Sequence, residues 1–337
     1  MSNLLPRRTR GRQTASKQAE YEQAVAAFCA TLKEIASRLD FRVSSRGWCY
    51  LLENRGAITK SEFDAAQTLI NDCRKAGLLP LNFCAEDVSR EFDHVEDIDE
   101  DDTGDYAVRL VRSLRGWCDD YIPVSFWADK PVYIQMLVEK IDLRELFAPT
   151  CAEYRIPIAN GKGWSDINQR AEMMGRFAEH DAEGRRCVLL YCGDHDPAGL
   201  RISDAIKETM AQLTPAVGWD PGNLIVDRFG LNYDFIRDNR LSWIENLETG
   251  GRGKVNDLAD PTHPDHGQPY VQNYLAQYGP RKVEANALVV VPEAGRKLCL
   301  DAILRWLPDQ DAPDRYTRQL QPIRQQAWEA VQKAMRA

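Results

Sequence analysis

The sequence predicts an α/β protein in which a helical N-terminal domain precedes a domain with a mostly parallel sheet. Short apolar runs alternate with helical patterns from 132 onward, which is typical of parallel strands joined by helices. Before them lie segments whose apolar residues recur at helical spacing. The length of 337 residues favours two domains, because a single core usually stops growing at about 250–300 residues.

Three helices are expected in the N-terminal part. One spans 17–39, the second lies between Ser44 and Gly56, and the third lies between Thr59 and Gly77. The run "LLPLNF" that follows has the pattern of a short strand. Three helices and a strand are typical of a winged helix-turn-helix, which places one helix in a DNA groove. A small helical bundle has the same pattern and stays open as an alternative.

An acidic segment separates the two predicted domains. Residues 86–105 hold eleven acids and one arginine, within a total net charge of −8. Because this segment is poor in apolar residues, we expect a linker at 91–105 between domains of residues 1–90 and 106–337. A basic groove needs only local positive charge, so the acidic total does not exclude nucleic-acid binding.

The composition excludes several classes of protein. The aliphatic stretch "ALVVV" at 287–291 is far shorter than the roughly 20 residues that span a bilayer, and no apolar signal segment opens the chain. Nine cysteines without a CxxC pair disfavour a disulfide framework and a zinc finger. We therefore expect a cytoplasmic protein with no membrane partner. The basic tail "PRRTRGR" fits both a solvated arm and one that contacts phosphates.

The predicted sheet is built from four apolar runs. They are "VYIQMLV" (132–138), "RIPIA" (155–159), "CVLLYC" (187–192) and "NLIV" (223–226), and the stretch 198–213 between the last two is helical.

The sharpest chemical motif is Asp194-His195-Asp196, which follows an apolar strand and precedes a Pro-Gly turn. In an extended chain, residues two apart face the same side, so both carboxylates face one point while His195 turns away. Two close carboxylates repel unless a cation lies between them, and Mg²⁺ is the oxygen-preferring ion that suits such a pair. The alternative is a solvated acidic turn that caps a helix.

Glu139 ends another apolar strand. Because the ends of parallel strands converge, it is a candidate third carboxylate for the same ion. A glutamate at this position is also favoured simply by the dipole of the helix that follows.

Arg46 and Tyr50 share one face of a predicted helix, because they are four residues apart. A tyrosine beside a guanidinium is able to attack a phosphodiester if the phenolate and the phosphorus intermediate are stabilised. The alternative is that Tyr50 is a core aromatic residue.

These motifs together resemble the A subunit of type IIB DNA topoisomerases, a superfamily that includes topoisomerase VI and the meiotic double-strand-break protein. The segment "YCGDHDPAGL" (191–200) is close to the family's GDxDPxG form. "GKGWSD" (161–166), "VDRFGLNYDFIRDNRL" (226–241) and "RKVEANAL" (281–288) resemble its other segments. The resemblance spans roughly residues 40–300.

The resemblance implies a winged-helix domain joined to a Toprim domain, and Mg²⁺-dependent cleavage of double-stranded DNA. Tyr50 would form a 5′-phosphotyrosyl link, with Arg46 neutralising charge on the phosphoryl oxygens. Asp194 and Asp196 would hold Mg²⁺, for which Mn²⁺ could substitute, and Glu139 would be a further ligand or a proton donor. The resemblance also implies a homodimer at the nucleoid and raises a separate ATPase subunit as a partner.

The sequence departs from the family pattern beside the tyrosine. Gly47 stands where an acidic residue is frequent, and Cys49 where an aromatic is frequent. The compact chain without an ATPase module resembles the stand-alone mini-A proteins more than a full topoisomerase VI subunit. Two other functions stay open: a Toprim nuclease that hydrolyses DNA without a covalent link, and a non-catalytic DNA-binding subunit of a larger complex.

Overall fold

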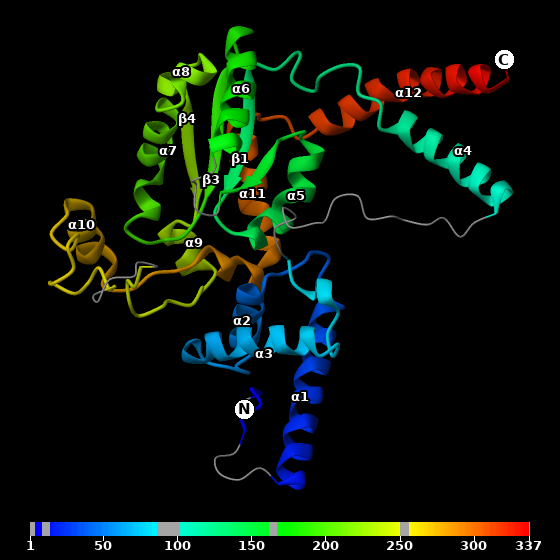
Figure 1. The fold of residues 1–337 in the computed structure, drawn as a ribbon. Coiled ribbons are helices and arrows are strands. Elements are labelled where there is room, and N and C mark those ends of the chain that lie inside the picture. The colour runs from blue at the N-terminus through cyan, green and yellow to red at the C-terminus, as the bar shows by residue number, and fades with distance from the viewer. Residues whose placement is uncertain (1–3, 9–13, 86–101, 162–166, 250–255, 337) are drawn as a thin grey trace.

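The sheet is the centre of the structure, a computed structural model that describes residues 4–8, 14–85, 102–161, 167–249 and 256–336 (Figure 1). Its four strands are all parallel, in the order β2-β1-β3-β4. They are β1 (Val132–Val138), β2 (Ile158–Asn160), β3 (Arg186–Cys192) and β4 (Ile225–Gly230). The predicted α/β class with a mostly parallel sheet is confirmed.

The positions of the strands follow the apolar runs, with one shift. The run at 155–159 overlaps β2 only at its end, because Arg155 has a left-handed φ of 53° that turns the chain out of the preceding helix. The central strands β1 and β3 are buried on nearly every residue, as expected for a parallel sheet covered on both faces.

Helices cover both faces of the sheet. The chain leaves β1 through α5 (Ile141–Glu153) to reach β2 on one side, and it returns through α6 (Ile167–Ala182) to β3 on the other. α7 (Ile202–Ala211) then leads to β4, and α11 (Pro292–Trp306) packs beside α5. Right-handed crossovers in opposite directions place α5 and α7 on opposite faces. The point where the direction reverses therefore lies between β1 and β3.

Shorter elements complete the α/β part. They are η4 (Gly199–Arg201), α8 (Thr214–Val217), η5 (Pro221–Asn223), α9 (Tyr233–Asp238), α10 (Pro269–Tyr278) and η6 (Ala285–Val290). None of the helices in the described ranges is long and apolar enough to cross a membrane.

The three predicted N-terminal helices are present. They are α1 (Ala15–Ala36), α2 (Ser45–Asn54) and α3 (Phe63–Lys75), the last preceded by η1 (Lys60–Glu62). Ser44 caps α2, since its hydroxyl accepts the Gly47 N–H at 3.1 Å. Thr59 and Glu62 form the predicted capping box, and Gly77 has the left-handed φ of 71° that ends a helix.

The strand predicted at "LLPLNF" is wrong. Leu81–Phe83 form a 3₁₀ turn (η2), in which the Phe83 N–H donates to the Pro80 carbonyl at 3.0 Å. Pro80 has no N–H to offer a ladder, and the Phe83 ring stacks on Trp48, at 4.8 Å between centroids, instead of facing a second strand. Among the described residues, the N-terminal part contains helices and turns without a strand, so a wing is not shown.

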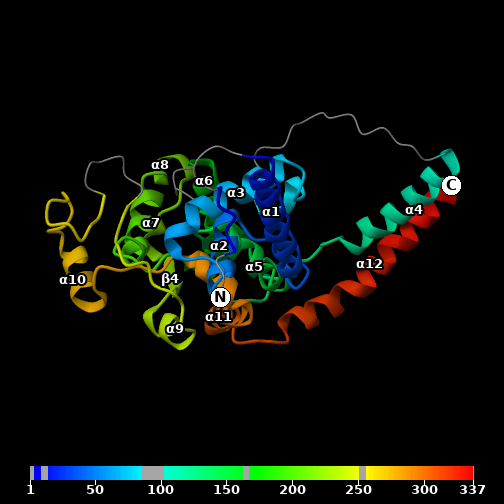
Figure 2. The same cartoon turned by 90° about the horizontal axis from the view of Figure 1, so that it is seen from below.

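The predicted linker ends earlier than expected. Residues 86–101 lie outside the described part of the chain, but Asp102 caps α4 (Thr103–Asp119) by accepting the N–H groups of Gly104 and Asp105. A carboxylate there is stabilised by the helix dipole, so acidic residues begin a helix rather than extend the linker. α4 pairs with α12 (Ala312–Arg336), and both project from the body (Figures 1 and 2).

One buried carboxylate joins the N-terminal helices to the sheet domain. Asp142, at the start of α5, is 0% exposed and accepts hydrogen bonds from the Ser44 backbone and hydroxyl and from the Asn286 amide. α2 packs directly on η6 at this junction, and buried residues of both parts form one continuous apolar cluster. A buried charge with three donors fixes the orientation of the two parts.

We predict that Asp142→Ala lowers the free energy of unfolding by about 3 kcal/mol, because it leaves three buried donors without an acceptor. Urea unfolding followed by circular dichroism measures this change. Asp234→Ala removes an exposed ion pair with Arg237 and serves as the control, with an expected change below about 0.5 kcal/mol. Equal effects of the two substitutions would contradict a joining role for Asp142.

Candidate active site

The three predicted acidic residues lie at the carboxyl ends of the two central strands. Glu139 directly follows β1, and Asp194 and Asp196 follow β3. These strands are neighbours, and the connection direction reverses between them. In open α/β sheets this switch point is where ligands bind. The expected convergence of the strand ends is therefore confirmed.

Lys140 occupies the space between two of these carboxylates. Its Nζ lies 2.7 Å from Glu139 Oε1 and 2.9 Å from Asp194 Oδ2. Glu139 Oε2 also accepts the Asp194 backbone N–H at 2.9 Å. Glu139 and Asp194 thus already bind one cationic group between them.

Asp196 faces a different space. Its Oδ1 accepts the Gly199 N–H at 2.6 Å, and with Glu139 it lines a cavity of about 210 Å³. Glycine is required at position 199, where a Cβ would lie 2.2 Å from the Asp194 carbonyl oxygen. A Cβ at Gly193 would meet the ends of two side chains, at 2.5 Å from the Tyr191 hydroxyl and 2.7 Å from Glu139 Oε2. The chain therefore approaches the carboxylates as closely as its backbone allows.

The donor atoms of these carboxylates are of the type that a divalent cation prefers. Oxygen donors are what Mg²⁺ and Mn²⁺ prefer, and the pair formed by Glu139 and Asp194 binds the Lys140 ammonium. In the described residues, however, three or more ligand side chains do not converge on one point. A metal ion at Glu139 and Asp194 would take the place of the ammonium, and Asp196 would have to turn from its bond with Gly199.

Burial controls the charges of this acidic group. Desolvation raises the pKa of Asp194 to about 7, against the opposing effect of Lys140. Desolvation also raises the pKa of Asp196. Although burial opposes it, the Lys140 ammonium and the Asp194 backbone N–H hold the pKa of Glu139 below its ordinary value. Glu139 is therefore a carboxylate near neutral pH, which suits a ligand better than a proton donor.

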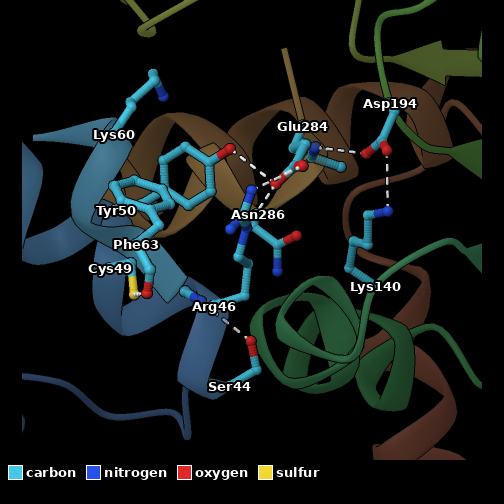
Figure 3. Close-up of polar contacts among 12 residues, drawn as sticks. Ser44, Arg46, Cys49, Tyr50, Lys60, Phe63, Lys140, Asp194, Glu284 and Asn286 are labelled. Carbon is cyan, nitrogen blue, oxygen red and sulfur yellow. Dashed lines mark hydrogen bonds and ion pairs between the residues drawn. The ribbon is translucent and has the colours of Figure 1, made fainter. Parts of the chain in front are cut away.

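Arg46 and Tyr50 both bind Glu284, which belongs to the segment 281–288. The Tyr50 hydroxyl donates to Glu284 Oε2 at 2.9 Å (Figure 3). Arg46 donates to both carboxylate oxygens, with Nε at 3.0 Å from Oε2 and Nη2 at 3.1 Å from Oε1. Although burial opposes it, the paired Arg46 lowers the pKa of Glu284, so Glu284 is an ionised carboxylate that accepts the hydrogen bond of the tyrosine.

Tyr50 is buried in this arrangement. Its side chain is 1% exposed, its ring contacts Phe63 edge to face, and Lys60 Nζ lies 4.5 Å from the ring centroid. Burial, followed by the negative charge of Glu284, raises the pKa of Tyr50 well above its ordinary value. The hydroxyl is therefore protonated at neutral pH.

The tyrosine and the acidic group are parts of one network. The residue after Glu284, Ala285, donates its backbone N–H to Asp194 Oδ1 at 2.8 Å (Figure 3). The negative charge of Asp194 also contributes to the raised pKa of Tyr50. Beside Glu284, a cleft of about 370 Å³ is lined by three cationic residues, Arg46, Lys60 and Lys282, and by three acidic residues, Asp64, Glu248 and Glu284 itself. All predicted site residues except Asp196 are therefore connected through hydrogen bonds or ion pairs.

The structure explains why position 47 is a glycine, which the sequence alone did not. A Cβ at this position would lie 2.6 Å from both Asp142 Oδ1 and Val43 Cγ1. An acidic side chain after Arg46 would therefore collide with the carboxylate that joins the two parts of the protein. The departure from the resembled family is thus explained by the packing of α2 on α5.

Sequence reasoning missed or undervalued several residues of the site. It did not identify Lys140 as the cation between two carboxylates, and it gave no role to Asp142 or Asn286. An acid in the first turn of a helix is common enough to carry no signal by itself. His195 is in the orientation expected from strand alternation: it lies among Trp243, Tyr274 and Tyr278, away from the acidic group.

Comparison with known proteins adds no relative: no family model, curated protein or solved structure matches this chain.

We predict that Lys140→Met lowers stability without divalent cations by about 3 kcal/mol, because it leaves two buried carboxylates without a positive charge. Added Mg²⁺ should restore the melting temperature, with a larger rise than in the wild type, since the ammonium no longer competes. Scanning calorimetry with EDTA and with Mg²⁺ measures both effects. Lys207→Met, on an exposed face of α7, is the control. A variant that Mg²⁺ does not stabilise would remove these carboxylates from a metal site.

We also predict a pH dependence from Asp194. Its folded pKa of about 7 exceeds the unfolded value of about 3.9, so the folded state binds more protons and loses stability as pH rises between them. The Asp194→Asn variant has no ionisable group at this position and does not lose stability in this way. Relative to the wild type in EDTA, the variant should therefore gain about 2 kcal/mol between pH 5 and pH 8. A difference in unfolding free energy that stays constant over this range would show that Asp194 is already ionised at pH 5.

Proposed function

We propose that this protein breaks DNA strands by transesterification, with Tyr50 as the nucleophile, in the manner of type IIB topoisomerase A subunits. The observation that carries the proposal is the shared network of Tyr50, Arg46, Glu284 and the acidic group at the ends of β1 and β3. A buried core tyrosine needs neither a bidentate arginine–glutamate pair nor a link to a carboxylate at a switch point.

In the proposed reaction, a tyrosine ester of the phosphate replaces the ester bond to the 3′ oxygen. The Tyr50 oxygen forms a bond to the scissile phosphorus while Glu284 Oε2, its hydrogen-bond acceptor, takes the phenolic proton. The bond between phosphorus and the 3′ oxygen breaks, and that oxygen leaves with a proton from the solvent or from Lys140. The products are a 5′-phosphotyrosyl link and a free 3′ hydroxyl.

Cationic residues stabilise the developing charge. Arg46 and Lys60 line the cleft beside Glu284, where they are placed to contact the phosphoryl oxygens. Glu139 and Asp194 would hold Mg²⁺, with Asp196 as a further candidate, and the ion would supply additional neutralisation of the phosphate. The lowered pKa of Glu139 favours its role as a ligand over its role as proton donor.

The burial of Tyr50 favours a second candidate function. A hydroxyl on a side chain that is 1% exposed has to become accessible before it attacks DNA, whereas Glu139 and Asp196 already line a cavity. A hydrolase that uses the metal site and water would need no such movement. In that case Tyr50 holds Glu284 in place and no covalent link forms.

The proposed function implies two partners, a second copy of the protein and a separate ATPase subunit. Cleavage of both strands of a duplex requires two sites, which a homodimer at the nucleoid in the cytoplasm would supply. A separate ATPase subunit would convert cleavage into strand passage. Because one chain links Tyr50 to its own Asp194 through Glu284 and Ala285, the geometry supports sites made within a chain rather than between chains.

We predict that the wild type with Mg²⁺ cuts supercoiled plasmid and that the ends remain attached to protein until protease is added. Tyr50→Phe removes only the hydroxyl, so cleavage should fall by more than about 1,000-fold while DNA affinity is unchanged. Glu284→Gln keeps the shape but not the base, and it should lower cleavage by about 100-fold. Plasmid gels after denaturation with and without protease measure both.

The outcomes separate the functions. Cleavage by Tyr50→Phe at the wild-type rate, with protein-free ends, supports the hydrolase. Plasmid that stays intact with both Mg²⁺ and Mn²⁺ supports a non-catalytic DNA-binding subunit. Asp234→Ala, at an exposed position of α9 outside the network, is the control for general damage.

A further inference from the structure

A second cavity lies on the other side of the turn that carries Asp196. Pro197, Leu200 and Arg201 of this turn line a cavity of about 190 Å³, together with one face of α10 at the edge of the sheet domain (Figure 1). Asp196 and Gly199 line the cavity that also contains Glu139, so one short turn separates the two cavities. A group bound in the second cavity would therefore lie beside the acidic group.

The face of α10 that lines this second cavity carries three aromatic rings and two carboxamides. Tyrosines recur at every fourth residue, at Tyr270, Tyr274 and Tyr278, and Asn273 and Gln277 lie beside them. With about 3.6 residues per turn, all five fall within an arc of about 140° and form one face of the helix. This face combines flat apolar surface with a few hydrogen-bonding groups, as ligand sites do.

The middle tyrosine of this face fixes the cavity to the acidic loop. Tyr274 is 2% exposed, and its hydroxyl donates to the His195 carbonyl oxygen at 2.8 Å. The other two tyrosines are only half-buried, and both carboxamides are exposed. Among the described residues, neither carboxamide has a hydrogen-bond partner. The cavity is therefore held in place by one ring while the remaining groups are available to a ligand.

Arginines accompany the aromatic rings in this region. The Arg201 guanidinium carbon lies 4.7 Å from the Tyr270 ring centroid, and that of Arg281 lies 4.2 Å from the Trp243 centroid. One further tyrosine ring connects Trp243 to Tyr278 at the end of the cavity. Aromatic rings interleaved with arginines are typical of surfaces that stack the bases of a single strand while cations contact its phosphates.

We propose that this second cavity, the base cavity, binds one unpaired nucleobase of a DNA strand that lies at the acidic group. The inference rests on the proposed function for its substrate and adds a site that binds the strand without cutting it. The base stacks on Tyr270, and the Asn273 and Gln277 amides bond to its edge, because a carboxamide offers a donor and an acceptor side by side. A cavity smaller than the roughly 300–1,000 Å³ of sites for drug-sized ligands suits one ring system, and a base has to leave the duplex to enter it.

A proline-rich peptide is the competing ligand, because aromatic-lined grooves also bind polyproline helices. The surroundings of the base cavity favour the nucleobase. A nucleic-acid strand brings a phosphate with each base, and the Arg201 guanidinium is a suitable partner for that anion. Polyproline carries no anion, and nothing in its chemistry relates to the acidic group on the other side of the turn.

The test compares two labelled single strands of about ten nucleotides, one with bases and one abasic throughout, so that both carry the same phosphates. Fluorescence anisotropy measures their affinities in EDTA, in the full chain with Tyr50→Phe, so that no strand is cut. The strand with bases should bind about 10-fold more tightly, which is the usual contribution of stacking one base. Tyr270→Ala should reduce this difference to within about 2-fold, and Tyr270→Phe, which keeps the ring, should retain it.

A second variant keeps the test independent of how Tyr270→Ala folds. Asn273→Ala with Gln277→Ala changes only exposed amides and should weaken binding of the strand with bases by about 5-fold. Gln272→Ala, on α10 but outside the base cavity, is the control and should have no effect. Equal affinity for the two strands, or a difference that both cavity variants leave unchanged, would overturn the proposal, as would displacement of the strand by a decaproline peptide. None of these measurements requires cleavage, so the inference can fail while the plasmid test succeeds, and the reverse.

Discussion

Three consecutive residues, Glu284, Ala285 and Asn286, hold the N-terminal helices, the sheet and the candidate site in one arrangement. The Glu284 carboxylate binds Arg46 and Tyr50 of α2, and the Ala285 N–H binds Asp194 at the end of β3. The Asn286 amide donates to the buried Asp142, which also accepts a hydrogen bond from Ser44 at the start of α2. Because these contacts share one short segment, a shift of the N-terminal helices relative to the sheet would break the bonds of Ser44, Arg46 and Tyr50 together.

This constraint explains why buried charges are tolerated in the site. Each carboxylate is desolvated, which alone would raise its pKa and disfavour its charged form. Arg46 compensates Glu284, and Lys140 compensates both Glu139 and Asp194. The two cations come from different elements, α2 and the loop after β1, so the charge of Glu284 is balanced only when the N-terminal helices pack on the sheet domain. Asp196 accepts a backbone N–H, that of Gly199.

The sheet and the positions of the acidic residues could be predicted because they depend on local patterns. Apolar runs that end in Glu139 and Asp194 identify strands and their ends, and the capping residues of α2 and α3 identify helix starts. The strand expected at 78–83 could not be distinguished from a turn, since its apolar residues serve packing against Trp48 rather than a ladder. The roles of Lys140, Asp142 and Glu284 depend on partners more than 50 residues away, which no local pattern encodes.

The link between Tyr50 and Asp194 bears on how a double-strand cut would be controlled. If a site were shared between chains, association itself would assemble it. Here one chain already joins the tyrosine to the acidic group, and the Tyr50 hydroxyl is instead restrained by burial and by its bond to Glu284. A phosphate entering the cleft beside Glu284 would compete with Glu284 for Arg46, because both are anions that the same guanidinium binds. Loss of that ion pair would free the Glu284 carboxylate to take the tyrosine proton, so the substrate itself would activate the nucleophile.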